Sequence, residues 1–377
     1  MRREILSTHA AFAAFGVFWG AWAALLPAVQ RQTGASKGQL GLALLCVALG
    51  ALPAMLATGA LLDRVGRGLV APGLVAFGAA IVAPGFATSV GALAAALLAV
   101  GATSGALDVA VNAQASALES ASGRRLMAVA HALFSAGVVV GSVSVGLARQ
   151  AGAGPRGVVL GVAVVLASTA TVNSGARALP TPMPPTARRL NLARPYVALG
   201  LLCAIAFVVE NGGEQWSALF VETRLHGGPA VAGLGPGAFA ASMVVGRLAG
   251  GEIERRLGER IVLVSGACVA TVGLVAAAAA PSFAVAIVGF ALTGIGISVA
   301  APTLFGAVGR RAGDEDRGSA MAAVTTVSYL GFFAGPPLVG GVSGAFGLRV
   351  GMLVLAGVAA LYGLGVASSS ALDRRGS

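Results

Sequence analysis

Asp108 is an acidic residue inside a strongly apolar stretch that begins at Val90, which makes it the first candidate for chemistry in this chain. At helical spacing it shares one narrow polar stripe with Ser104, Asn112 and Glu119. A carboxylate near the middle of a bilayer costs at least ~2.5 kcal/mol on insertion scales, so we expect it to face water or a polar partner. Asp108 is therefore predicted to carry a proton at a working site. The alternative is that Asp108 and Asn112 only join helices through hydrogen bonds.

Glu210 and Glu214 form a second acidic pair within an apolar stretch. Their i, i+4 spacing places them on one face of a helix, where mutual repulsion favours the protonation of one of the two. The alternative is that Glu214 lies at the watery mouth of the helix and only Glu210 is buried. His131, in another apolar stretch, is a candidate to relay protons to Asp108, unless a neighbouring helix satisfies its hydrogen bonds.

Aromatic, hydroxyl and amide side chains in the same stretches are candidates to line a solute cavity. Tryptophan rings stack on the ring of a solute, while hydroxyl and amide groups bind its polar atoms. The predicted cavity residues are Trp19, Trp22, Ser104, Asn112, Asn211 and Trp216. For Trp22 and Trp216, a place in the core or in the aromatic belt at the membrane surface is the alternative.

The composition places these residues in a membrane protein. Of 377 residues, 57% are hydrophobic and only 10% are charged, whereas a soluble domain carries roughly a quarter charged residues. The net charge of +11 comes from short basic clusters between apolar runs, without the basic stripe that nucleic-acid binding needs. The three cysteines lie far apart, so we expect no metal site and no disulfide framework. The sequence holds no nucleotide loop or nucleophile with a base, so we also expect no cofactor and no enzymatic activity.

Hydropathy divides the chain into twelve apolar runs, the number that a chain of this length supplies at ~20 residues per crossing. The runs lie near residues 9–29, 39–62, 69–88, 90–119, 127–148, 156–173, 195–222, 229–251, 260–280, 282–308, 319–341 and 347–368. Four prolines and several arginines between the sixth and seventh runs are typical of an irregular linker. We predict an all-α membrane protein with twelve transmembrane helices in two six-helix bundles, residues 1–173 and 195–377, joined by a cytoplasmic linker, 174–194.

The basic residues indicate the orientation of the chain. Twelve crossings place both termini on one face, and that face then holds nineteen of the 25 basic residues, against six on the other. Because cytoplasmic loops carry the excess of Lys and Arg, both termini are predicted to be cytoplasmic. We expect a multi-pass protein of the bacterial inner membrane.

The two halves resemble each other at an offset of 192 to 194 residues. Trp22 matches Trp216, and Gly137 matches Gly331, with neighbouring residues in the same register. A near-constant register in separate places indicates an internal duplication, which is common in transporters.

The loop after the second run carries a charged motif. It reads Gly59-Ala-Leu-Leu-Asp63-Arg64-Val-Gly66-Arg67. Gly59 is suited to close helix packing, Gly66 to a tight turn, and the charged residues to switchable ion pairs at the membrane surface; a solvated basic loop is the alternative.

The motif resembles the Gly-x-Leu-x-Asp-Arg-x-Gly-Arg loop of the major facilitator superfamily. The resemblance implies that the loop is a conformational latch that holds the halves together when the inside is closed. It also implies that an arginine of the loop lies near an acidic residue that ends the fourth span, and Glu119 stands at that place. The corresponding segment of the second half, 246–258, lacks the Asp-Arg dipeptide at the matched register.

Segments around Asp108, His131 and Glu210 narrow the resemblance to a bacterial branch related to fucose-permease-like sugar/proton symporters, which includes many transporters of unassigned substrate. The resemblance implies that Asp108 is the proton-coupling carboxylate of the fourth span. The acidic residue that those symporters carry in the first span is absent here. A Gly/Pro motif like that of proton/drug antiporters is present at Gly335-Pro336, but in the eleventh run and not in the fifth.

These observations predict a secondary active transporter that works by alternating access as a monomer. We expect symport of a sugar-like polar solute with protons. One alternative is proton-coupled efflux of lipophilic compounds, and another is a transporter-like receptor or lipid-moving protein without coupled transport.

Overall fold

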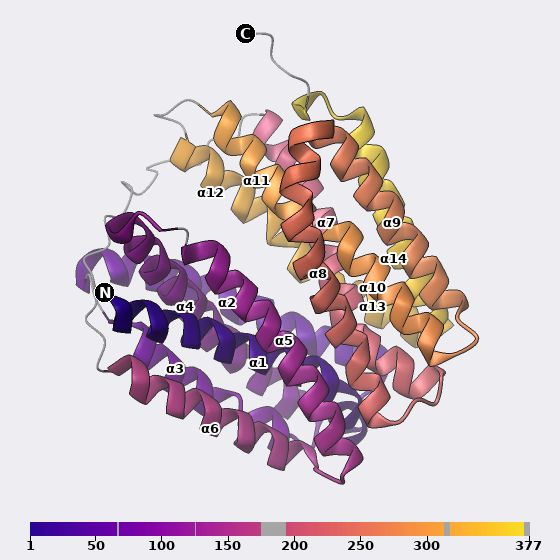
Figure 1. Cartoon of the computed structure of the whole chain (residues 1–377). Helices are drawn as coiled ribbons and strands as arrows, with labels where there is room; N and C mark the ends of the chain where they lie inside the picture. Colours follow the sequence, from indigo (N-terminus) through magenta and orange to yellow (C-terminus); the bar gives the residue numbers. More distant parts are fainter. Residues whose placement is uncertain (66–67, 125, 175–193, 313–316, 373–377) are drawn as a thin grey trace. The chain divides into compact units, whose positions relative to one another are not determined.

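The computed structural model describes residues 1–65, 68–124, 126–174, 194–312 and 317–372, and all regular secondary structure among them is helical (Figure 1). Eleven of the described helical segments are long and apolar enough to cross a membrane. The chain divides into two compact units. The first holds the helices before residue 175 and the beginning of α8 up to Gly237, and the second holds the helices from α7 onward with the rest of α8.

The first unit contains six α-helices and one short 3₁₀ helix. Their bounds are α1 Arg2–Thr33, α2 Lys37–Val65, α3 Val70–Ala80, η1 Ala83–Phe86, α4 Val90–Ser122, α5 Leu126–Gln150 and α6 Pro155–Ser174. The apolar run expected near 69–88 is therefore interrupted: α3 ends after eleven residues, and η1 follows with Pro84, which has no N–H to continue an α-helix.

The second unit holds the remaining helices, some of which follow one another in pairs to form longer apolar segments. Their bounds are α7 Arg194–Leu219, a π-helical turn η2 Phe220–Arg224, α8 Pro229–Leu257, α9 Glu259–Ala279, α10 Phe283–Ile297, α11 Ala300–Arg311, α12 Arg317–Ser328, α13 Leu330–Phe346, α14 Leu348–Ser368 and η3 Ser370–Leu372. Two of the candidate spans, Phe283–Arg311 and Ser319–Phe346, are each built from two of these helices in sequence.

Glycines bring α1 and α5 into backbone contact. A Cβ atom on Gly137 would overlap the carbonyl oxygen of Ala13, and one on Gly141 would overlap that of Val17. Contacts of this kind need small residues, which is how helices associate in lipid. Both contacts advance in the same direction along the two helices, so α1 and α5 run parallel.

The same contact recurs in the second unit at matching positions. A Cβ atom on Gly331 would overlap the carbonyl oxygen of Ala204, and one on Gly335 would lie 3.6 Å from Val208. Gly331 and Gly335 stand 194 residues after Gly137 and Gly141. The α7 residues that they contact, Ala204 and Val208, stand 191 residues after the α1 residues Ala13 and Val17. The two units thus repeat one packing arrangement, in agreement with the duplication indicated by the sequence.

α2 and α4 form a second parallel pair in the first unit. A Cβ atom on Gly101 would overlap the carbonyl oxygen of Val47, and one on Gly105 would come within 2.7 Å of that of Ala51. The close approach fixes the rotation of α4, which carries Asp108, about its axis.

Aromatic rings fix α1 against α3 in the core of the first unit. Phe77 of α3 meets Phe18 edge-on at 4.8 Å between ring centroids and Phe15 at 5.4 Å. Such pairs add about 0.5–1.5 kcal/mol each beyond the burial of their surface. They set the orientation of the part of α1 that carries Trp19 and Trp22.

Candidate functional site

Asp108 lies close to the middle of the long helix α4 and is half-buried. Its Oδ1 accepts a hydrogen bond from the Asn112 side-chain amide at 3.0 Å, and the same amide donates to the Asp108 backbone carbonyl at 2.9 Å. Among the described residues, Asn112 is the only side chain with a hydrogen bond to the Asp108 carboxylate. Ser104, one turn before Asp108, is buried and donates to the carbonyl of Gly101. The Asp108 carboxylate is therefore held by one described amide, and the residue remains partly accessible.

Glu210 lies at the middle of the candidate span Pro195–Arg224 and pairs with Arg247 of α8. Oε1 of Glu210 and Nη2 of Arg247 are 3.4 Å apart, and the two side chains are 20% and 35% exposed. The sequence-based orientation counts Arg247 among the nineteen basic residues on the face that holds the termini. It lies instead ten residues before the end of α8, about 15 Å inside the helix at 1.5 Å per residue. The signal for this ion pair was present in the sequence as a single arginine within the apolar run 229–251.

Glu214 is half-buried one turn beyond Glu210, and α7 remains α-helical through both residues. The two glycines between them lie against large side chains. A Cβ atom on Gly212 would lie 2.9 Å from the Leu355 side chain, and one on Gly213 would lie 2.8 Å from the ring of Phe239. The glycines thus admit large neighbours that hold this part of α7 in place.

His131 lies near the start of α5 with an exposed side chain. Its imidazole ring meets the ring of Phe12 edge-on, with 5.3 Å between centroids. The neighbouring helix α1 therefore contributes to the surroundings of this histidine.

The three tryptophans differ in accessibility. Trp22 is 2% exposed and Trp216 is fully buried, and the indole nitrogen of each has no hydrogen-bond partner within the described part of the chain. Trp19 is only half-buried and packs edge-on against Phe18 at 5.1 Å. Asn211 is also half-buried, and its Oδ1 is a buried atom without a partner among the described residues. In this conformation the side chains of Trp19 and Asn211 are partly exposed, whereas Trp22 and Trp216 are packed as core residues.

Most of the predicted latch lies outside the described residues. This applies to Gly66 and Arg67 and to the side chains of Asp63 and Arg64. Gly59 is described, and a Cβ atom there would meet no atom of the described residues within 4 Å, so no close contact with a described helix requires this glycine.

Glu119, the predicted acidic partner of the latch, accepts a hydrogen bond at Oε2 from the backbone N–H of Met127 at 2.9 Å. Met127 is the second residue of α5, so Glu119 satisfies one of the N–H groups that a helix start leaves unpaired. The carboxylate therefore fixes the turn between α4 and α5.

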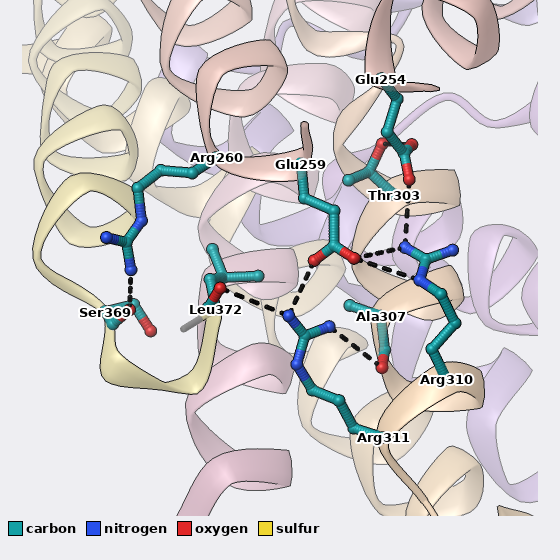
Figure 2. Close-up of polar contacts among 9 residues, drawn as sticks. All are labelled: Glu254, Glu259, Arg260, Thr303, Ala307, Arg310, Arg311, Ser369 and Leu372. Atoms are coloured by element: carbon teal, nitrogen blue, oxygen red, sulfur yellow. Dashed lines mark hydrogen bonds and ion pairs between the residues drawn. The ribbon is translucent and has the colours of Figure 1, made fainter. Parts of the chain in front are cut away.

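A charged network, missed by the sequence analysis, joins α8, α9 and α11 in the second unit (Figure 2). Arg310 lies 3.0 Å from Glu254 and 2.8 Å from Glu259, and Arg311 lies 2.9 Å from Glu259. Glu254 also accepts the hydroxyl of Thr303 at 2.7 Å. Glu254 stands 191 residues after Asp63, the same offset as the α7 residues that match α1. At this offset, Glu254 followed by Arg255 is the sequence counterpart of Asp63-Arg64.

The chain is similar to known membrane transporters in sequence and in fold. Residues 201–375 match the family model described as Major Facilitator Superfamily. An uncharacterized MFS-type transporter of Yersinia pestis is 34% identical over 374 residues, which cover 97% of this chain and 94% of that protein. A solved bacterial homolog of the human lysosomal transporter Spinster gives a TM-score of 0.76 at 17% identity, covering 98% of this chain and 96% of that one. The structure of a mutant of the nucleoside transporter NupG gives a TM-score of 0.80 at 12% identity, covering 97% of this chain and 99% of that one. At these identities the two structures share a fold with this chain.

Proposed function

Because the chain belongs to the major facilitator superfamily, we propose that it moves a small polar solute across the bacterial inner membrane by alternating access, coupled to protons. The observation that carries the proposal is one carboxylate near the middle of a span in each unit: Asp108 on α4 and Glu210 on α7. Ionisable groups at this depth are costly, and they mark solute or proton pathways far more often than they serve stability.

The two carboxylates have different surroundings, which suggests different roles. Among the described residues, the Asn112 amide alone bonds to the Asp108 carboxylate, so no described ion pair opposes its protonation from the aqueous side. Glu210 has Arg247 beside it, so protonation of Glu210 releases the guanidinium from its ion pair. We assign proton uptake to Asp108. We assign a switch to the Glu210–Arg247 pair: in one state the ion pair is closed, and in the other Arg247 is free to bind a polar group of the solute.

The proposed solute contacts follow from accessibility. Trp19 and Asn211 have exposed surface, and Asn112, whose amide nitrogen donates to Asp108, also carries an amide oxygen that can accept a hydrogen bond. An indole face with amide groups suits a sugar-like solute, which offers hydroxyl groups around an apolar ring face. Glu214 and His131 are secondary candidates for proton transfer, and the latch is assigned to the loop after α2.

The architecture proposed with this function has twelve crossings. α2 and α4 run parallel, so the chain between them must return across the membrane once. The intervening segment Val70–Phe86 is apolar and, at 1.5 Å per residue, spans about 25 Å, close to the ~30 Å of a hydrocarbon core. With this segment counted, we propose two six-helix bundles, 1–173 and 195–377, a cytoplasmic linker 174–194, and both termini in the cytoplasm, with the protein acting as a monomer.

The proposal is tested with the purified protein in sealed liposomes that carry an imposed pH gradient, acid outside. Uptake of radiolabelled sugars and nucleosides is measured for the unaltered protein, Asp108→Asn, and the control Thr103→Ala, whose hydroxyl donates to backbone carbonyls of α4 itself. We expect the gradient to drive uptake of one of these solutes, Asp108→Asn to abolish the accumulation, and Thr103→Ala to retain it. Accumulation that ignores the gradient, or that survives Asp108→Asn, would contradict proton coupling through Asp108. Accumulation of lipophilic dyes only under the opposite gradient would favour efflux.

A further inference from the structure

A cavity of about 570 Å³ opens in the second unit, where α8 ends and α9 begins. The end of α11 and Leu372 of η3 complete its wall. Among the described residues, its charged lining consists of four arginines and two glutamates, which are Arg255, Arg260, Arg310, Arg311, Glu254 and Glu259. The described lining therefore has a positive formal charge, which favours an anion.

The ion pairs within the lining organise the arginines without exhausting them. Arg310 is held through Nε and Nη2 by Glu254 and Glu259, yet its side chain is 52% exposed. Within the described part of the chain, Nη1 of Arg310 makes no hydrogen bond. Arg311 is fixed between Glu259 and the carbonyl of Leu372 (Figure 2). An anion would thus meet donors that are already positioned, which lowers the entropic cost of binding.

The rim of the cavity is apolar. Leu257 and Ile261 both belong to the lining, and each is 54% exposed. Exposed apolar residues continue along α8 at Ile253 and Leu248, which are 42% and 76% exposed. A soluble anion gains nothing from such a rim, whereas an anion attached to hydrocarbon chains does.

Three helix ends meet at the cavity, those of α8, α9 and α11, all of which belong to candidate spans. The ends of membrane-spanning helices lie near the level of the phospholipid phosphates, and basic pockets between spanning helices bind anionic lipid headgroups. We propose that this cavity binds the phosphate group of an anionic phospholipid, with its acyl chains lying along Leu257 and Ile261.

The test uses two adjacent arginines as a matched pair. Arg255 and Arg256 both pair with Glu252 and are 76% and 74% exposed, but only Arg255 lines the cavity. Binding of fluorescent phosphatidylglycerol to the purified full chain is measured in neutral detergent. Arg255→Gln is expected to weaken binding about fivefold, the worth of one arginine near an anionic lipid, while Arg256→Gln leaves it unchanged. Equal effects of the two substitutions, or none from Arg255→Gln, would overturn the proposal.

Leu257→Gln separates the lipid from a soluble phosphate. It preserves every charge of the lining, and we expect it to weaken phosphatidylglycerol binding severalfold. Inorganic phosphate and glycerol 3-phosphate are added as competitors, and they are expected to displace the lipid only at concentrations far above the lipid's own. Displacement by either at equal concentration, or full lipid binding by Leu257→Gln, would show that the cavity takes a soluble anion and would overturn the assignment to lipid. Circular dichroism of each variant establishes that the helices are intact.

Discussion

Glu210 on α7 and Arg247 on α8 place an acid and a base 3.4 Å apart, each well inside a segment long and apolar enough to cross a membrane. Two isolated charges in such segments would each carry a large desolvation cost, and the pair reduces it by mutual attraction. The side chains retain 20% and 35% exposure, so the pair is neither sealed in a core nor freely solvated. An ion pair in this position can open and close at moderate cost.

Arg247→Met should destabilise the protein more than the double substitution Glu210→Gln with Arg247→Met. The single variant leaves Glu210 charged without its partner, at an expected cost of about 1–3 kcal/mol for a pair that is only partly buried. Thermal unfolding in detergent at neutral pH measures the difference. The deficit should shrink as the pH falls, because a protonated Glu210 needs no cation. Equal stability of the single and double variants at neutral pH would show that the pair contributes nothing.

Trp19 should differ from Trp22 and Trp216 in its effect on transport. Trp19→Ala is expected to raise the KM for the solute severalfold, since its ring is accessible. Trp22→Phe and Trp216→Phe should leave the KM unchanged, because both rings are buried and their indole nitrogens have no described partner to lose. Transport kinetics in liposomes test all three. A raised KM in Trp216→Phe with normal folding would return that residue to the solute site.

Gly141→Ala should destabilise the first unit, whereas Gly161→Ala should not. A Cβ atom at residue 141 overlaps the carbonyl oxygen of Val17, a backbone atom that cannot move alone, so we expect a cost of about 1–3 kcal/mol. Gly161 of α6 has no atom within 4 Å of the same position, and alanine is the better helix former there. Denaturation midpoints of the two variants provide the comparison. Equal midpoints would contradict the close packing of α1 and α5.

Glu259→Gln should weaken the second unit more than Glu252→Gln. Glu259 is 21% exposed and joins α9 to Arg310 and Arg311 of α11. Glu252 is 40% exposed and, among the described residues, pairs with Arg255 and Arg256 of its own helix. We expect the free energy of unfolding to fall by about 1 kcal/mol in Glu259→Gln and by at most about 0.5 kcal/mol in Glu252→Gln. Both losses should be smaller at high salt, which screens the ion pairs. Limited proteolysis or thermal unfolding at two salt concentrations measures this. A larger effect from Glu252→Gln would contradict the inferred role of the network.

The sequence by itself determined the features that depend on composition and on short spacing. Long apolar runs have to form helices in a membrane because lipid offers no partner for backbone groups, so the helices begin and end near the limits of these runs. The match of Gly137 with Gly331 also indicated the duplication, since the same close contact with α1 and with α7 needs a glycine in both halves. Asp108 and Glu210 could be chosen as candidates because a charge in an apolar run is conspicuous without any knowledge of its neighbours.

Only the tertiary structure decided which partner each of these residues has. Spacing along a helix identifies a face, but it does not say which helix packs against that face or how deep a side chain lies. For this reason Arg247 could be taken for a surface residue, Gly59 for a packing glycine, and Trp216 for a cavity residue, until α8, α2 and α7 were placed in their units. The hydrogen bond from Met127 to Glu119 likewise depends on the turn between α4 and α5. Contacts between segments distant in sequence are set by packing geometry, which a single chain's residue pattern does not specify.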